Sequence, residues 1–178
     1  ELAASLLIKL LYGSRMAAPW LSVGIQRLAR QVHKWSAECD RRLHRLYCYV
    51  FGNRDLVIQG VLSTSDIDNL TLDVWVDADL AGDTFDAKST SGRFIELAGL
   101  AGRSMPITWA AQQQAGSARH TQDAEIVSMA DGMAKDGIPV QELLARILRK
   151  PIVRICREDN EAAITAARKG YSPSLRHL

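Results

Sequence analysis

The stretch LTLDVWVDAD, residues 70–79, decides the fold class of this 178-residue chain. Leu72, Val74 and Val76 recur at every second position, and this alternation predicts a β-strand with one buried face. Asp77 lies inside the same strand, where aspartate is disfavoured. Its presence therefore indicates a role other than packing.

Shorter stretches that favour strands or helices surround this strand, separated by residues typical of turns. We predict further strands at residues 56–62, 92–97, 106–110 and 152–156, and helices at residues 121–135, 140–149 and 159–169. The return from the helices to a last strand is a crossover connection, which predicts a parallel pairing. The sequence therefore predicts an α/β fold with a mixed sheet, three antiparallel strands plus one parallel strand, covered by helices.

The first 52 residues predict a small helical segment that precedes this sheet. Apolar residues recur at intervals of three and four over residues 2–11, 19–35 and 36–50. Gly13 is expected to end the first helix and Ser36 to cap the third. The composition changes at Asn53, so we expect two domains, residues 1–52 and residues 53–178.

Charge is distributed unevenly along the chain, although the net charge is only +2. Residues 1–50 hold 8 Lys/Arg against 3 Asp/Glu, whereas residues 51–120 hold 5 against 9. A basic segment followed by an acidic one suits a polyanion-binding arm beside a carboxylate site. Arg41, Arg42 and Arg45 are therefore candidate nucleic-acid contacts. The solvated face of an ordinary helix would account for them as well.

Three carboxylates occupy positions where chemistry is commonly placed: Asp77, Glu125 at the start of a helix, and Asp159 between a strand and a helix. If the first and last strands of the sheet pair, these side chains meet. Clustered carboxylates repel one another unless cations neutralise them, and Mg²⁺ prefers such oxygen ligands. Two ions of this kind clamp the attacking and leaving oxygens of a phosphodiester. The set therefore predicts phosphodiester hydrolysis.

Each carboxylate also has a purely structural explanation. Asp77 and Asp79 would mark a strand end that turns into Gly82. Glu125 would complement the helix dipole behind a Thr121 cap, and Asp159 would itself cap the last helix. From the residues alone, the chemical and the structural explanations both stay open.

Several classes of protein and of site receive no support from the sequence. Cys39, Cys48 and Cys156 have no CxxC spacing, which argues against a disulfide framework or a structural zinc site and favours a reducing compartment. No run of 18 apolar residues occurs, so we expect no membrane span. The sequence also lacks the GxGxxG, P-loop, HExxH and GxSxG motifs. Because the chain begins with Glu1, we expect a piece of a longer polypeptide.

Five stretches together resemble the ribonuclease H end of copia-type LTR retrotransposon polyproteins. The most specific is VDADLAGDTFDAKSTSGRF, which resembles the strand and turn signature of that family. PITWA resembles its third strand, DAEIVSMADG its Glu-Ala-Glu helix, and EDNEAAITAA its Asp-Asn motif. LLYGSRMAAPWLSVGIQRLAR resembles the helical segment that connects the reverse transcriptase to the ribonuclease H domain. In the order in which they are quoted above, the five stretches are residues 76–94, 106–110, 123–132, 158–167 and 10–30.

The resemblance implies a ribonuclease H-like fold and hydrolysis of the RNA strand of RNA–DNA hybrids. It implies two Mg²⁺ ions, with Mn²⁺ as a substitute, held by the catalytic residues Asp77, Glu125 and Asp159. Asp79 and Asp123 flank these positions and are not expected to act. The implied partners are the hybrid and the reverse transcriptase portion of the same polyprotein. The implied location is inside the cell, in a cytoplasmic particle or the nucleus.

The chain departs from the family pattern at three places. Leu80 stands where the family has an aromatic residue, and AQQQ at residues 111–114 lacks the lysines of the family, which predicts weaker hybrid binding. The triplet Arg176-His177-Leu178 resembles the one that precedes the fourth carboxylate of the family. We therefore expect the ribonuclease H-like domain to be truncated at its C-terminus, before that carboxylate and the last strand and helix.

Two alternatives to a hybrid-cleaving enzyme stay open. The first is a catalytically inactive retrotransposon remnant that acts at most as a nucleic-acid-binding or structural fragment through its basic first 50 residues. The second is a helical connection module that positions a polymerase. No Tyr-x-Asp-Asp signature occurs, so the chain does not itself carry a polymerase site.

Overall fold

The computed structural model describes residues 2–82 and 87–170 and divides into two compact units. Unit 1 is Glu1–Ile58 and unit 2 is Gln59–Leu178, whereas the sequence places the boundary at Asn53. Among the helices of the described ranges, none combines the length and the apolar character that crossing a membrane requires.

Unit 1 is built from helices around a small apolar core. They are α1 (Leu2–Met16), a 3-10 helix (Pro19–Leu21), α2 (Ser22–Ala29), a 3-10 helix (Val32–Lys34) and α3 (Ala37–Gly52). Ser36 caps α3 as predicted, because its hydroxyl accepts a hydrogen bond from the backbone N–H of Cys39. The predicted end of the first helix at Gly13 is wrong, since α1 continues to Met16. The buried core residues are Leu7, Leu10, Leu21, Ile25, Leu28, Cys39 and Leu43.

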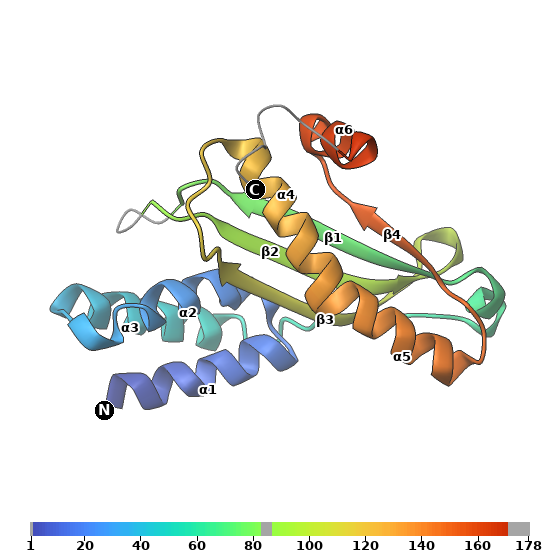
Figure 1. Cartoon of the computed structure of the whole chain (residues 1–178). Coiled ribbons are helices and arrows are strands. Elements are labelled where there is room, and N and C mark those ends of the chain that lie inside the picture. The colour runs from blue at the N-terminus through green and yellow to red at the C-terminus, as the bar shows by residue number, and fades with distance from the viewer. Residues whose placement is uncertain (1, 83–86, 171–178) are drawn as a thin grey trace. The chain divides into compact units, whose positions relative to one another are not determined.

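Unit 2 is a mixed four-stranded sheet with helices (Figure 1). Its elements are β1 (Thr71–Asp79), β2 (Thr90–Ala98), β3 (Ser104–Gln113), α4 (Thr121–Gly132), a π-helical turn (Met133–Gly137), α5 (Ile138–Leu148), β4 (Val153–Arg157) and α6 (Glu161–Lys169). The strand order is β3-β2-β1-β4, with β1 parallel to β4 and the other two pairings antiparallel. The predicted α/β class and mixed sheet are therefore confirmed, and the architecture is consistent with a ribonuclease H-like fold.

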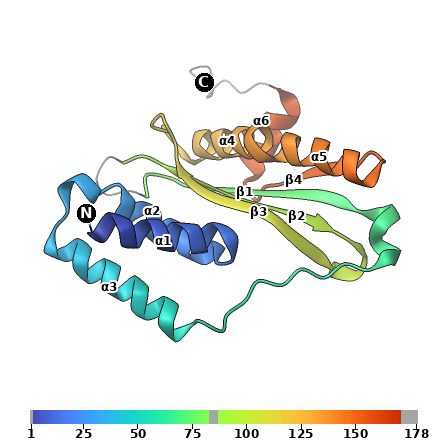
Figure 2. The ribbon, with the colours of Figure 1, turned by 90° about the horizontal axis from the view of Figure 1, so that it is seen from below.

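The alternation along β1 has the predicted effect on burial. Leu72, Val74 and Val76 lie in the core of unit 2, on the face of the sheet that α4 and α5 cover (Figure 2). Helix α4 approaches β1 closely because Gly132 lies there: a Cβ at this position would lie 2.5 Å from Val76 Cγ1. This close packing fixes the face of α4 that is presented to β1.

The strand predicted at residues 56–62 is wrong, because these residues form no strand in the described part of the chain. Leu56, Val57 and Val61 are all at least half exposed, so the apolar run buries little surface. Val61 N–H donates to the carbonyl oxygen of Ser104 at 2.7 Å, but this contact does not extend into a ladder. Apolar composition without the period-2 alternation of β1 was insufficient to form a strand here.

The segment predicted as a polar link contains a capped 3-10 helix, Thr64–Asn69. Ser63 and Asp66 form a capping box at its start. Asp66 is fully buried and also binds the guanidinium of Arg103. The link is therefore a fixed connection that ties the entry to β1 to the turn between β2 and β3.

Candidate functional site

Glu125 is a buried carboxylate on the face of α4 that packs against β1. Its side chain is 4% exposed, and its Oε2 has no hydrogen-bond partner among the described residues. Burial, together with the negative charges of Glu158, Asp77 and Asp159, raises its pKa to about 7, while a backbone hydrogen bond with Ala78 acts in the opposite direction. A carboxylate in this environment is destabilised when ionised, and a nearby cation would relieve that cost.

The parallel pairing of β1 with β4 brings the other two predicted carboxylates to the same end of the sheet. Trp75 pairs with Arg157 at the end of the ladder, and Asp77 and Asp159 each follow two residues later. Both side chains are exposed, and both contribute to the repulsion on Glu125. The three residues singled out from the sequence thus share one neighbourhood, while their roles stay predictions.

Glu158 belongs to this neighbourhood too, although the sequence analysis did not select it. Its Oε1 accepts hydrogen bonds from the backbone N–H groups of Asp159 (3.1 Å) and Asn160 (3.0 Å). Its Oε2 is buried and has no hydrogen-bond partner in the described ranges. Burial raises the pKa of Glu158 above its usual range. Of the neighbouring charges that raise the pKa of Glu125, the charge of Glu158 has the largest effect.

Alternation along β4 is the signal that could have identified Glu158. Cys156 lies against the core of unit 2, whereas Arg157 turns to the opposite face and binds Asp73. Residue 158, two positions after Cys156, is therefore expected on the core side that also holds Glu125.

The structural explanation offered for Asp159 is wrong. Asn160 caps α6, since its Oδ1 accepts from the backbone N–H of Ala163 at 3.0 Å. The Thr121 cap proposed for the other helix is also wrong. His120 caps α4 and accepts from the backbone N–H of Asp123. The cap at Asn160 removes the reason for regarding Asp159 as a helix cap.

Asp123 and Asp79 flank the predicted catalytic residues. Each of them lies against residues that are close to it in the sequence. Asp123 is fully buried; its Oδ2 accepts from the backbone N–H of Arg119 at 3.1 Å, and its Oδ1 lies 3.3 Å from His120 Nε2. The carboxylate of Asp79 lies so close to Gly82 that any side chain there would overlap it. Each of these carboxylates thus contributes to the geometry of a helix start or a turn.

The side chains at the sheet end carry the donor atoms that a hard divalent cation prefers. It consists of carboxylate oxygens, two of which, Glu125 Oε2 and Glu158 Oε2, are buried without partners within the described residues. In those same residues, no three His, Cys, Asp or Glu side chains are yet close enough together to hold a metal ion. To hold a cation, these carboxylates would have to lie closer together than they do in this structure.

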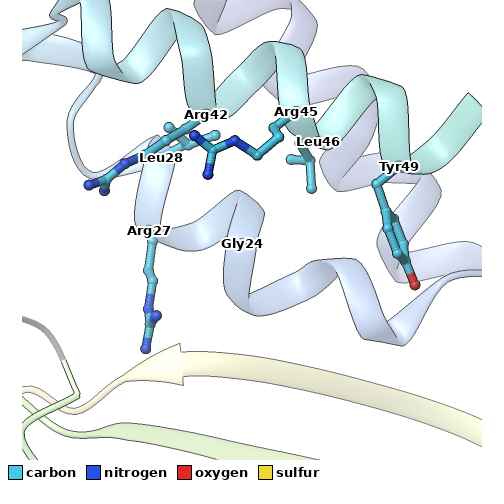
Figure 3. Close-up of a pocket in the computed structure, with 7 residues that line it drawn as sticks. All are labelled: Gly24, Arg27, Leu28, Arg42, Arg45, Leu46 and Tyr49. Atoms are coloured by element: carbon cyan, nitrogen blue, oxygen red, sulfur yellow. The ribbon is translucent and has the colours of Figure 1, made fainter.

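A second candidate site lies in unit 1, in a pocket of about 460 Å³ between α2 and α3 (Figure 3). Among the predicted nucleic-acid contacts, Arg42 and Arg45 line this pocket and Arg41 does not. Arg41 and Arg42 both pair with Glu38, at 2.8 Å and 3.0 Å. The residues that line this pocket are Gly24, Arg27, Leu28, Arg42, Arg45, Leu46 and Tyr49.

Part of the predicted pattern lies outside the described residues. This applies to the triplet Arg176-His177-Leu178 and to residues 83–86 of the turn after β1. Leu80 is exposed, and Gln114 is buried, donating to Ser91 Oγ at 2.9 Å and to the carbonyl oxygen of Ala124 at 2.8 Å. Gln114 therefore fastens the end of β3 to α4.

Comparison with known proteins identifies relatives of one kind. The chain is 32% identical over 113 residues to the retrovirus-related Pol polyprotein from transposon RE2 of Arabidopsis thaliana, covering 64% of this chain and 7% of that protein. It is 28% identical over 138 residues to the corresponding polyprotein from transposon RE1 of the same plant, covering 76% of this chain and 9% of the relative. The chain thus spans less than a tenth of the length of either relative.

No family model matches the chain, and no solved structure matches it significantly. The two similarities support a relationship to retrotransposon Pol polyproteins.

Proposed function

We propose that this chain is the ribonuclease H portion of a copia-type retroelement polyprotein, and that it hydrolyses the RNA strand of RNA–DNA hybrids. Support comes from the mixed sheet, the carboxylates at the ends of β1 and β4, and the similarity to retrovirus-related Pol polyproteins. Unit 1 would be the helical connection to a reverse transcriptase portion of the same polyprotein.

The observation that carries the proposal is the environment of Glu125. A protein gains nothing in stability from a buried carboxylate that has an unpartnered oxygen and three acidic neighbours, since each of these raises the cost of ionisation. Strongly perturbed groups of this kind cluster at functional sites. The hydrolysis of a phosphodiester is a reaction that such a group of oxygen ligands can serve.

Asp77, Glu125 and Asp159 would hold Mg²⁺, or Mn²⁺ in its place. The bound cations would neutralise the carboxylates and stabilise the charge that develops on the phosphodiester. Asp77 and Asp159 lie exposed at the strand ends, where they can reach a substrate from solvent. In the metal-free chain the pKa of Glu125 is raised to about 7, and a bound cation would lower it. The hybrid would be recognised by its A-form shape and its backbone.

A hybrid-cleavage assay tests this proposal. We expect weak Mn²⁺-supported cleavage of the RNA strand, and less with Mg²⁺, because Mg²⁺ demands near-octahedral geometry. Asp77→Asn should abolish the cleavage while preserving size. Asp55→Asn is the matched control, since the Asp55 side chain is 98% exposed and lies in unit 1. Equal cleavage by the Asp77→Asn variant and the parent would assign the activity to another source.

A second candidate function is nucleic-acid binding without cleavage, and the pocket between α2 and α3 favours it. Arg45 lines this pocket and makes no ion pair or hydrogen bond within the described ranges, so its guanidinium is available to a phosphate. If Arg45 contacts one phosphate, Arg45→Gln should reduce the slope of log affinity against log salt by about 0.9 on duplex DNA. Arg168→Gln in α6 is the control. Retained hybrid binding without any metal-supported cleavage would favour this function.

A further inference from the structure

The pocket between α2 and α3 in unit 1 combines positive charge, apolar side chains and an aromatic ring. Leu28 and Leu46 supply apolar surface, and Tyr49 supplies the ring. Figure 3 shows Arg42 and Arg45 toward one end of the pocket and the Tyr49 ring at the other. Its volume of about 460 Å³ lies within the range of small-molecule sites. The pocket therefore has room for a ligand that carries both an anion and a flat ring.

Two arginines of the pocket offer hydrogen-bond donors to an anion. Arg42 donates from Nε to Glu38 at 3.0 Å, and its two terminal nitrogens make no hydrogen bond among the described residues. Arg45 makes neither an ion pair nor a hydrogen bond in that part of the chain. A guanidinium group is planar and always charged, and its forked donors match the oxygens of a phosphate. A phosphate is therefore the anion that suits this end of the pocket.

Tyr49 lies four residues after Arg45 on α3 (Ala37–Gly52), so the two side chains project from the same face of the helix. Four residues of an α-helix span about 6 Å along its axis. A phosphate on Arg45 and a base on Tyr49 can therefore belong to one nucleotide. Tyr49 is 46% exposed, which leaves its ring open to a stacking partner. Stacking of bases on aromatic rings beside a basic groove is how many proteins bind unpaired strands.

Other anionic ligands use only part of this pocket. The bases of a duplex are paired and stacked on one another, so a duplex offers its phosphates to the arginines but no free base to Tyr49. The carboxylates of an acidic peptide would also satisfy the arginines, but they carry no flat ring for Tyr49. An unpaired nucleotide is the ligand that uses both ends of the pocket.

We propose that the pocket between α2 and α3 binds an unpaired nucleotide, with its phosphate on Arg42 and Arg45 and its base against Tyr49. The inference rests on the second candidate function, nucleic-acid binding, and specifies the chemical form of the ligand. It is independent of the carboxylates at the ends of β1 and β4. A single strand and a free nucleotide both carry this chemistry.

Fluorescence anisotropy of a labelled oligothymidylate of about 12 nucleotides, titrated with the full chain, tests the role of the ring. Tyr49→Leu keeps apolar bulk and removes the ring, and we expect it to weaken binding about fivefold or more. Tyr49→Phe keeps the ring and should bind like the parent. Tyr12→Leu in α1 is the matched control, because Tyr12 is 69% exposed and lies outside the pocket. Binding of an RNA–DNA hybrid should be the same for Tyr49→Leu and the parent.

Substitution of Gly24 tests the space in the pocket without changing a charge. A Cβ at Gly24 would lie 3.6 Å from Leu46 Cδ1, which is an ordinary contact, so Gly24→Ala should bind the oligothymidylate like the parent. Gly24→Leu places a larger side chain in the pocket and should weaken binding as Tyr49→Leu does. Arg45→Gln should reduce the slope of log affinity against log salt by about 0.7 on the single strand.

Each outcome separates the nucleotide pocket from the second candidate function. Equal oligothymidylate affinity of the parent, Tyr49→Leu and Gly24→Leu overturns the pocket. Displacement of the probe by polyglutamate as effectively as by unlabelled oligothymidylate also overturns it. In both cases, hybrid binding with a salt slope that depends on Arg45 leaves the second candidate function standing. A parent that binds neither the single strand nor the hybrid overturns both.

Competition with thymidine monophosphate distinguishes the two sources of the nucleotide. Displacement of the probe from the parent by millimolar thymidine monophosphate, at a concentration that depends on Tyr49, supports a site for a free nucleotide. Tyr49-dependent probe binding that thymidine monophosphate does not displace supports a site for a strand.

Discussion

Arg157, the last residue of β4, donates from Nε to Oδ2 of Asp73 in β1 at 2.8 Å. The Asp73 side chain is only 4% exposed, and the guanidinium of Arg157 also lies over the ring of Trp75. The bond fastens together the two parallel strands whose ends carry the candidate carboxylates. The geometry of the site thus depends on an ion pair on the face of the sheet opposite α4.

Replacing this arginine tests how strongly the pair holds the two strands together. Arg157→Met keeps most of the apolar stem but leaves the Asp73 carboxylate buried without its cation. We expect the free energy of unfolding to fall by about 1–3 kcal/mol, the cost of an unsatisfied buried polar group. Urea denaturation at pH 7 measures this change. Arg168→Met, at an exposed position on α6, should lie within about 0.5 kcal/mol of the parent.

The ion pair between buried Asp66 and Arg103 should make stability depend on pH in the acid range. Arg103 donates from Nε and Nη2 to the two carboxylate oxygens, at 2.8 Å and 2.5 Å, and holds the pKa of Asp66 well below its usual range. A depressed pKa contributes stability above the unfolded value of about 3.9, and this contribution is lost as the pH falls below it. Asp66→Asn should therefore be less stable than the parent at pH 5–8, and the difference should shrink below about pH 4.

Denaturation midpoints of the parent and Asp66→Asn across pH 3–8 supply this measurement. Asp68→Asn is a suitable control because its side chain is 93% exposed. A difference between the parent and Asp66→Asn that stays constant down to pH 3 would contradict the assignment of the acid sensitivity to this pair.

Glu125 should make the stability of the protein depend on pH in the opposite direction, and at higher pH. Its pKa of about 7 lies above the unfolded value of about 4.3, so the folded state retains a proton that the unfolded state has lost. Stability without metal should therefore fall as the pH rises from about 4 to 7, by up to about 3 kcal/mol. Glu125→Gln should flatten this decline, as should saturating Mn²⁺ added to the parent. Identical pH profiles for the parent and Glu125→Gln would refute the perturbed pKa.

Two glycine substitutions should change stability in opposite directions. A Cβ at Gly132 would lie 2.5 Å from Val76 Cγ1, so Gly132→Ala should push α4 from β1 and cost about 1–3 kcal/mol. Gly13 lies within α1 with nothing within 4 Å of its Cβ position, so Gly13→Ala should stabilise unit 1 by about 0.5–1 kcal/mol. Thermal unfolding of both variants checks the signs. Equal tolerance at both positions would show that α4 can move freely away from the sheet.

The parts of the fold that could be predicted from the sequence are those with a strong local period. The alternation at Leu72, Val74 and Val76 identified β1, and the crossover argument identified its parallel partner β4. The strand predicted at residues 56–62 is wrong because apolar content alone does not show whether a strand edge is available for pairing or whether another layer covers the segment. Two helix caps lie one residue away from the predicted positions, at His120 and Asn160, because a neighbouring polar side chain accepts the capping hydrogen bond there.

The candidate site was partly predictable for a related reason. Asp77, Glu125 and Asp159 could be named from motif positions, and the fold places them at one end of the sheet. Glu158 could not be selected by residue type, since an acidic residue before a helix start is commonplace. Only its orientation, which follows from the register of β4, distinguishes it from an ordinary helix-end acid.

The π-helical turn Met133–Gly137 makes the chain sensitive to changes of length in this region. Each residue of an α-helix advances the side-chain direction by about 100°, so the extra residue of a π turn rotates everything that follows by about that angle. Val140 and Leu144 pack against the core of unit 2 in this rotated phase. Deletion of a single residue between Met133 and Gly137 would let α4 run straight into α5 and turn both side chains away from the sheet. Insertions and deletions should therefore be far less common here than single substitutions in any descendant of this sequence that still folds.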